Sequence, residues 1–483
     1  MLNQVGRDAA VNSMGMILPA LAGLLAMPVL LHNIGEARLG VFTLALGVIG
    51  LTGLLDFGVA RGITQFLASQ SDGETKQAAV SVTLRRSLVA LAAIGLILSA
   101  CLWLVADPIT VKLFRLPDEL CSQTSQGLKW IGLSIPFALI SMAAAGILEG
   151  RRDFLKVNAI RAPLNVLTFI VPMVLSFWTS HLGHLIAALG ITRVLGSFVW
   201  MWAIRDENIF FAAGGQGSHL SRILKFSSWL SVSNIIGPLM IYTDRFYLAS
   251  LYPPATVALF TVPFDASFRA TSLPVAAMNA VFPALSSRGL SADVREAIML
   301  SAGKMLFLLW LPPLFLAVLY ADKILSVWLN PSFGENATTV FQLILIGVFL
   351  NGFAHIPVAG LHAAGRSDIT AKIHAAELPF YLIIMISAIN TWGLHGAAVA
   401  WLVRISVDTA LMYVAEYTTC VNAARGKLVV LGGCFSAAAC MLLLVVFQAV
   451  LNRGVVVTIS AAILVPSSLI LFRSLRQEAL KLR

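Results

Sequence analysis

The first apolar stretch of the chain reads VNSMGMILPALAGLLAMPVLL and covers residues 11 to 31. It holds no charged residue, and it is long enough to cross the hydrocarbon core of a bilayer, which takes about 20 apolar residues in a helix. The apolar part of a cleaved signal peptide is shorter, at roughly 7–15 residues. We therefore predict that this stretch is an uncleaved first membrane span.

Similar stretches recur along the rest of the chain, and together with the first they are centred at roughly residues 21, 49, 97, 138, 170, 195, 237, 270, 313, 350, 383, 405, 439 and 463. The composition agrees, because 58% of the 483 residues are hydrophobic and 12% are charged, whereas soluble domains have about 45–50% and about 25%. Lipid is therefore expected to replace water around most of the chain. The predicted fold class is an all-α polytopic membrane protein of about fourteen transmembrane helices.

The positive charge follows the predicted spans. With a cytoplasmic N-terminus, 23 of the 33 lysines and arginines fall in inside segments, six fall outside and four lie within spans. Such an excess on one side is the positive-inside pattern of membrane proteins. The net charge of +10 is therefore assigned to topology. The predicted location is a bacterial cytoplasmic (inner) membrane, crossed many times, with both termini in the cytoplasm.

The sequence carries no motif of soluble chemistry. It has no Walker A pattern, no HExxH motif and no nucleophile elbow, and its five cysteines form no CxxC pair. Outside the apolar stretches it has no basic patch with interleaved aromatic residues, which a nucleic-acid binder would have. We expect neither an enzyme nor a nucleic-acid-binding protein, and neither a cofactor nor a metal.

An internal repeat divides the chain. Residues 150–154 read GRRDF and residues 365–369 read GRSDI. Phe42-Thr43 recurs as Phe260-Thr261. A third match lies in the sixth and twelfth spans, and all three keep their order and nearly their offset. The repeat unit is therefore predicted to be six spans long.

The repeat predicts the domain organisation. Residues 1–210 form an N-terminal six-helix bundle, residues 211–425 a C-terminal six-helix bundle, and residues 426–483 two additional helices and a cytoplasmic tail. Because six is an even number, the bundles share one orientation and are related by a pseudo-two-fold axis along the membrane normal. Transporters built this way hold the substrate between the halves and rock them. The polar, Gly-rich segment from 205 to 222 reads as the cytoplasmic linker.

Ionisable residues inside the predicted spans are functional candidates, because charge is costly at membrane depth. Asp265 and Arg269 are four residues apart, as are Arg404 and Asp408, so each pair lies about 40° apart on one helix. Each pair either neutralises itself or takes part in substrate or proton coupling, and both interpretations stay open.

Arg193 differs, because no carboxylate lies within four residues of it in the sequence. Its charge must be met by another helix, by water or by an anionic ligand. Arg193 and Arg404 occupy matching positions in the repeat, with one inserted residue. Two guanidinium groups that face one cavity suit a pyrophosphate, since arginine donates hydrogen bonds as a bidentate fork.

Other predicted spans also carry ionisable residues. Asp244 and Arg245 are adjacent and point about 100° apart, so one faces the cavity and the other a neighbouring helix. Asp56 is expected to be buried, and Arg61 either snorkels to the interface or reaches the cavity. The predicted substrate-binding residues are Arg193, Arg404, Arg269, Arg245 and Arg61, and the predicted coupling or ion-pair carboxylates are Asp56, Asp244, Asp265 and Asp408. The interfacial residues are expected to be His355, His362 and Glu377.

Several stretches resemble the polysaccharide transporter family of the multidrug/oligosaccharidyl-lipid/polysaccharide exporter superfamily, which includes O-antigen flippases. The resemblance covers nearly the whole chain, and the order of the motifs is specific. The matching stretches are Gly35 to Ala68 with Asp56-Phe57-Gly58, Asp244-Arg245, Ala258-Leu259-Phe260-Thr261-Val262-Pro263, Trp328-Leu329, Ala364-Gly365-Arg366 and Gly396-Ala397-Ala398-Val399-Ala400-Trp401.

The resemblance implies two six-helix bundles around a central cavity, often with two further helices. It implies a flippase that moves undecaprenyl-pyrophosphate-linked oligosaccharide repeat units from the cytoplasmic to the periplasmic leaflet. The products are O-antigen, capsule or exopolysaccharide. The implied partners are this lipid-linked oligosaccharide, membrane lipids, and polysaccharide polymerase and chain-length proteins. Related flippases have a cationic cavity, which the four arginines within the spans fit.

Three alternatives stay open. A cation-coupled drug or metabolite exporter of the same superfamily usually carries a carboxylate in its first bundle; residues 14–31 hold none, although Asp56 is a possible substitute. A flippase for peptidoglycan precursors has fourteen helices and a cationic cavity. The third alternative, from another class, is a non-transporting membrane scaffold or polymerase subunit.

Overall fold

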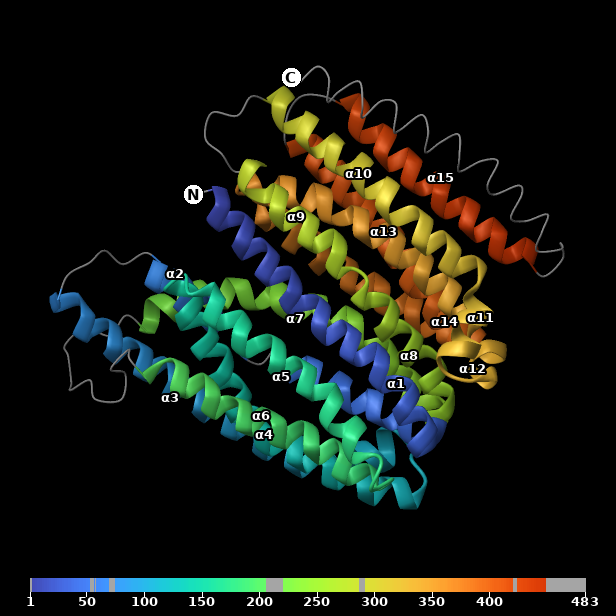
Figure 1. Cartoon of the computed structure of the whole chain (residues 1–483), viewed down its shortest axis with the longest axis horizontal. Helices are drawn as coiled ribbons and strands as arrows, with labels where there is room; N and C mark the ends of the chain where they lie inside the picture. Colours follow the sequence, from blue (N-terminus) through green and yellow to red (C-terminus); the bar gives the residue numbers. More distant parts are fainter. Residues whose placement is uncertain are drawn as a thin grey trace. The chain divides into compact units, whose positions relative to one another are not determined.

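The computed structural model describes residues 2–52, 56, 58–68, 74–205, 220–285, 292–419 and 424–448. These residues form helices joined by short turns (Figure 1). Nine of the helices within these ranges are long and apolar enough to cross a membrane. The predicted cytoplasmic linker and the predicted span near residue 463 lie largely or wholly outside the described residues.

The first helix, α1 (Leu2–Thr52), holds two of the predicted spans. It bends at Gly35, where φ is 81° and ψ is 167°. A residue with a Cβ atom rarely adopts a positive φ, so glycine is the residue that permits this bend. The two arms of α1 therefore correspond to the spans predicted near residues 21 and 49.

Next come α2 (Val59–Ala68), α3 (Glu74–Pro108) and α4 (Asp118–Gly150), with a short π-helical turn, η1 (Ile109–Leu113), after α3. Pro117 precedes α4 directly, and Asp118 and Glu119 in the first turn favour a helix start there, since acidic side chains complement the positive N-terminal end of a helix.

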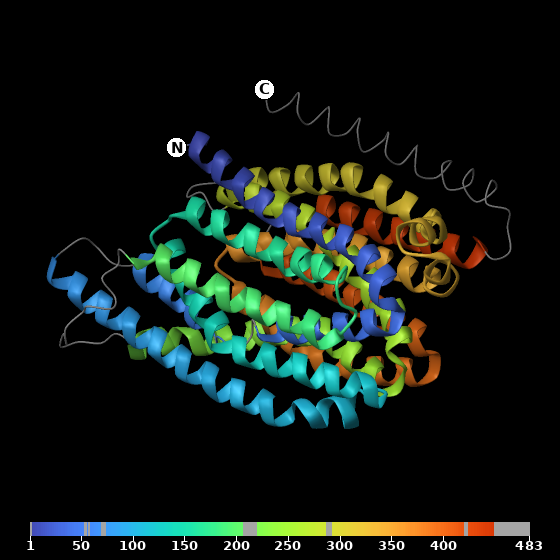
Figure 2. The same ribbon diagram turned by 60° about the horizontal axis from the view of Figure 1, so that its bottom comes forward.

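The helices α5 (Phe154–Leu175) and α6 (Leu182–Ala203) complete the first six predicted spans. Figures 1 and 2 show α3, α4 and α6 side by side, and α4 packs against both neighbours. Small residues let backbones approach where lipid surrounds the helices. At Gly146 of α4, for example, an added Cβ would come within 2.5 Å of the Ala60 carbonyl oxygen of α2, and the Thr64 hydroxyl donates to the Gly146 carbonyl oxygen at 3.0 Å.

The two Phe-Thr motifs of the repeat meet in the structure. Thr43 of α1 and Thr261 of α8 (Pro254–Arg269) are both fully buried, and their hydroxyl oxygens are 2.7 Å apart. Next to them, Gly40 allows close contact, since a Cβ there would overlap the Pro254 carbonyl oxygen. Two copies of one motif therefore pack against each other.

The helix α7 (Leu220–Leu251) packs on α1 and α2. The predicted span near residue 270 is divided between α8 and α9 (Ser272–Leu285), and α10 (Ala292–Leu319) follows. Two short helices, α11 (Ala321–Trp328) and α12 (Pro331–Asn336), lead to α13 (Thr338–Ala363). Phe307 of α10 packs against Phe349 and Phe353 of α13, with ring centroids 6.3 Å and 6.1 Å apart.

The last described helices are α14 (Ser367–Thr419) and α15 (Ala424–Gln448). α14 bends at Gly393, where φ is 59° and ψ is −129°, a combination that side-chain-bearing residues avoid. Its two arms correspond to the spans predicted near residues 383 and 405. Trp401 is fully buried, and Gly347 of α13 makes room for its ring.

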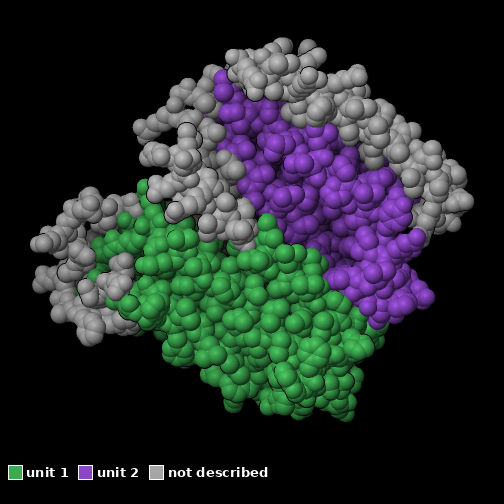
Figure 3. Space-filling model, in the orientation of Figure 1, with its two compact units in different colours: residues 1–262 green, residues 263–483 purple. Residues whose placement is uncertain are grey.

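The chain forms two compact units, residues 1–262 and 263–483, which Figure 3 colours separately. The first unit therefore includes α7 and part of α8 in addition to the first six predicted spans. The second unit contains most of the remaining predicted spans.

Candidate functional site

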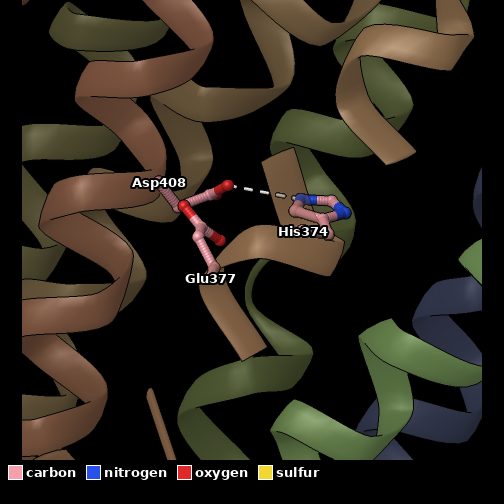
Figure 4. A group of neighbouring side chains, drawn as sticks. All are labelled: His374, Glu377 and Asp408. Atoms are coloured by element: carbon pink, nitrogen blue, oxygen red, sulfur yellow. Dashed lines mark ion pairs between the residues drawn. The ribbon is translucent and has the colours of Figure 1, made fainter. Parts of the chain in front are cut away.

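Three ionisable side chains gather inside the second unit. His374 and Glu377 come from the first arm of α14 and Asp408 from its second arm, and one ligand atom of each lies within 4.8 Å of the others. His374 Nε2 is 3.2 Å from Asp408 Oδ1 (Figure 4). Glu377 and Asp408 are buried, with 7% and 4% of their surface exposed, whereas the His374 side chain is 29% exposed.

The bend at Gly393 brings these side chains together. Glu377 and Asp408 lie at nearly equal distances along the chain on either side of Gly393. A helix rises by about 1.5 Å per residue, so folding α14 back on itself places the two carboxylates at the same level. His374 is one turn from Glu377 on the same arm, which puts it on the same face.

The carboxylate of Glu377 lacks a hydrogen-bond donor. Both of its oxygens are buried, and neither accepts a hydrogen bond from a donor in the part of the chain that the structure describes. The charges that act on it are those of Asp408, which repels it, and Arg404, which attracts it. A buried polar group without a partner costs free energy. Binding of a cation or a proton would therefore stabilise this carboxylate. A histidine nitrogen with two carboxylates is also a donor set that can hold a metal ion.

Arg404 was considered as the partner of Asp408, four residues away. In the structure its guanidinium carbon lies 5.6 Å from the centre of the Tyr381 ring, a cation–π distance. The side chain that lies within ion-pair distance of Asp408 is His374. Arg404 is half-buried, and its Nε atom has no hydrogen-bond partner.

Arg193 lies in α6 and belongs to the first unit. It is half-buried, and its Nη1 atom is buried without a hydrogen-bond partner among the described residues. Other arginines of this unit do pair, such as Arg38 with Glu119 and Arg161 with Glu149, at 2.7 Å and 2.6 Å. Arg193 thus presents a cation that is short of a partner. Its joint use with Arg404, which belongs to the other unit, stays a prediction.

Asp244 and Arg245 of α7 are fully buried. The backbone N–H of Arg245 donates to Asp244 Oδ1 at 2.6 Å, and the Arg245 guanidinium lies 4.8 Å from the centre of the Tyr242 ring. Both residues have further partners, as do Asp265 and Arg269 of α8, which are half-buried.

Asp56 lies at the start of α2 and is 4% exposed. Its carboxylate accepts hydrogen bonds from the backbone N–H groups of Gly58 and Ala60, at 3.0 Å and 3.3 Å. This is the geometry of a helix cap, which satisfies otherwise unpaired donors. Arg61 is exposed, and its positive charge attracts the carboxylate of Asp56.

Glu377 is expected at the membrane interface; the structure shows that its side chain is buried inside the protein, and its depth in the membrane stays a prediction. The sequence does hold a signal for its position. The first arm of α14 carries His374 and Glu377 one turn apart, and Asp408 lies equally far beyond Gly393. Considering α14 as a hairpin would therefore have grouped the three residues.

A family model described as MatE matches residues 13–171. A protein of Shigella flexneri named "Putative O-antigen transporter" is 28% identical over 410 residues, which cover 84% of this chain and 96% of that protein.

Two solved structures share the fold. Lipid II flippase MurJ, in an inward closed conformation, is 12% identical with a TM-score of 0.73, covering 97% of this chain and 99% of that one. A multidrug resistance MATE family transporter of the MOP superfamily, in an inward-facing conformation, is 14% identical with a TM-score of 0.68, covering 88% and 98%. The all-helical, polytopic fold expected from the sequence is confirmed.

Proposed function

We propose that the chain is a membrane transporter of the multidrug/oligosaccharidyl-lipid/polysaccharide exporter superfamily, as the MatE match and the relative from Shigella flexneri support, and that it flips undecaprenyl-pyrophosphate-linked oligosaccharide repeat units from the cytoplasmic to the periplasmic leaflet. The chain is a multi-pass membrane transporter and not an enzyme. Its proposed location is a bacterial cytoplasmic membrane.

The relative from Shigella flexneri supports the substrate class. Its name refers to O-antigen, and the match covers 96% of its length. O-antigen, capsule and exopolysaccharide units share a polyprenyl-pyrophosphate anchor, so we extend the proposal to these three products. Polymerase and chain-length proteins are the partners that such a flippase would supply.

The observation that carries the proposal is the state of Arg193. Its Nη1 atom is buried, and no group in the described ranges of the chain forms a hydrogen bond with it. An arginine desolvated in this way favours an anionic ligand, and a pyrophosphate offers oxygens for its bidentate fork. Arg404, whose Nε atom is likewise unpartnered, is proposed as the second contact, with Arg245, Arg269 and Arg61 as further cationic groups.

The proposed mechanism is alternating access. Fourteen spans in two six-helix bundles, with two additional helices, would expose a cationic cavity first to one side and then to the other.

The experiment that tests the proposal replaces Arg193 in cells that depend on this gene for surface polysaccharide. Arg193→Ala removes charge-assisted hydrogen bonds, which contribute about 1.5–3 kcal/mol each, so substrate binding should weaken roughly tenfold or more and surface polysaccharide should fall. Arg193→Lys keeps the charge but loses the fork, so an intermediate result is expected.

The matched control is Arg161→Ala. Arg161 pairs with Glu149, and its side chain is 43% exposed, so its loss costs about 0–1 kcal/mol of stability and should leave the polysaccharide unchanged. The protein level in the membrane is measured in parallel. Normal surface polysaccharide in Arg193→Ala cells would contradict the assigned role.

The alternative with an observation behind it is a cation-coupled exporter, because the MatE model covers residues 13–171. Such an exporter would need an ionisable Asp56 as its coupling carboxylate. Substrate accumulation assays separate the two: drug sensitivity on gene deletion favours the exporter, and accumulated lipid-linked oligosaccharide favours the flippase. Accumulated peptidoglycan precursor would identify the third candidate substrate.

A further inference from the structure

We propose that Glu377 and Asp408 form a binding site for a single proton, which the two carboxylates share and which enters and leaves through His374. The role of this proton in the transport cycle rests on the function proposed above. The evidence for the proton site itself is the set of contacts within α14, which does not depend on that function.

The first argument is the crowding of negative charge. Glu377 and Asp408 are both more than nine-tenths buried, and their oxygens lie within 4.8 Å of each other. Two ionised carboxylates at this distance in a poorly solvated site repel strongly. One proton between them removes the repulsion and turns two acceptors into a donor and an acceptor.

The second argument is the missing donor. Neither oxygen of Glu377 accepts a hydrogen bond from a donor among the described side chains and backbone groups, and the group within hydrogen-bonding reach of it is the carboxyl group of Asp408. An ionised carboxylate only accepts, whereas a protonated one also donates. A proton on Glu377 or Asp408 therefore supplies the hydrogen bond that this pair otherwise lacks.

The third argument is the balance of charge. The positive charge that acts on Glu377 is that of Arg404. One cation can balance one carboxylate, so a single proton on the second carboxylate makes the group neutral with His374 uncharged. A divalent metal ion would leave a surplus positive charge in a buried site. A sodium ion prefers several oxygen ligands, and here one of the three ligands is an imidazole.

His374 provides the route. Its Nε2 atom is 3.2 Å from Asp408 Oδ1, and its side chain is 29% exposed while both carboxylates are buried. An imidazole can accept a proton at one nitrogen and release another from the second. Two histidines of α13 interact electrostatically with this group, His355 with Asp408 and His362 with His374. Cys434 of α15 interacts electrostatically with Tyr413 instead.

The experiment is infrared difference spectroscopy of the purified protein in liposomes, titrated with acid and with no substrate added. A protonated carboxylic acid has a C=O band that a carboxylate lacks. Wild-type protein should show such a band from a buried group that exchanges slowly into D₂O. Glu377→Gln should abolish the band, and Asp408→Asn should abolish it too, because the remaining carboxylate keeps its charge beside Arg404.

The control is Glu416→Gln, which replaces another buried carboxylate of the same helix and should leave the band in place. A double variant should lose no more than either single variant, since one proton is shared. Where a variant fails to fold, Glu377→Asp keeps a carboxyl group and should shift the band rather than remove it.

Three results would overturn the proposal. The band could survive in either single variant, or the two variants could each remove a separate band, so that the losses add. Alternatively, equilibrium dialysis of wild-type protein could show one Zn²⁺ or Na⁺ ion bound per chain, lost in both variants. None of these readouts needs the lipid-linked substrate, so they are independent of whether the proposed flippase function holds.

The link to transport is tested separately in cells. Glu377→Gln fixes that side chain in an uncharged form, so a cycle that must gain and lose the proton stops there. Surface polysaccharide should fall several-fold with protein levels unchanged. If the infrared band is lost while polysaccharide stays normal, the proposed coupling role is wrong.

Discussion

At the scale of single residues, the charged side chains within the spans are held by different kinds of contact. Asp408 lies beside His374, while Asp56 accepts backbone hydrogen bonds. The sequence predicts that Asp408 and Asp56 are charged groups within membrane spans. It did not show which helix arm faces each of them, because a partner four residues away on the same helix competes with partners on neighbouring arms.

Asp56 supplies a residue-scale prediction. Since its carboxylate oxygens cap α2, Asp56→Asn keeps an acceptor oxygen and should leave surface polysaccharide near the wild-type level. Asp56→Ala removes the cap and should cost about 1 kcal/mol of stability. Surface polysaccharide and the thermal unfolding midpoint in detergent check both statements. Loss of transport in Asp56→Asn with unchanged stability would instead support a coupling carboxylate at this position.

At the scale of helices and turns, the repeat is visible in the structure with a corrected register. The Asp153 N–H donates to the Leu148 carbonyl oxygen, and the Arg366 N–H donates to the Leu361 carbonyl oxygen, both at 2.9 Å. The preceding residues, Arg152 and Gly365, both have positive φ. The two turns are therefore equivalent, with Arg152 matching Gly365. The sequence motif instead aligns Gly150 with Gly365, which is a register two residues away from the one that the hydrogen bonds define.

The bend in α14 gives an element-scale prediction. Gly393 has a φ of 59° and a ψ of −129°, so Gly393→Ala should cost about 1–3 kcal/mol and disturb the alignment of Glu377 with Asp408. The thermal unfolding midpoint and the infrared band both report this change.

The control for this bend is Gly432→Ala in α15. Gly432 is exposed, and an added Cβ there meets no atom within 4 Å. Alanine is favoured over glycine in a helix by about 0.5–1 kcal/mol, so this variant should be as stable as wild type or slightly more stable. Equal stability of Gly393→Ala and the control would show that the bend tolerates a side chain.

At the scale of the whole molecule, the succession of apolar stretches was enough to predict an all-helical polytopic chain. In α1 and α14, two helical arms meet at a glycine with non-helical backbone angles, Gly35 and Gly393, so each arm corresponds to one predicted span. The span near 270 is split between α8 and α9, with Ala270 and Thr271 in the turn. Apolar composition locates a span, but backbone conformation at single residues decides where the helix ends.

The candidate site was less predictable. Arg193 was singled out by the absence of an acid in its helix, and the structure leaves its Nη1 atom without a partner. Glu377 was missed as a buried group because hydropathy averages over a window and cannot show that two arms of one helix align. Knowing that Gly393 is a turn would have been sufficient to place Glu377 opposite Asp408.

The most direct measurement is translocation in proteoliposomes that contain only the purified chain and a fluorescent undecaprenyl-pyrophosphate-linked oligosaccharide. A membrane-impermeant glycosidase in the external buffer reports how much glycan reaches the outer leaflet. The account predicts that wild-type protein exposes the inner pool to the enzyme, and that Arg193→Ala slows this at least tenfold. Equal rates in wild-type, Arg193→Ala and protein-free liposomes would contradict it.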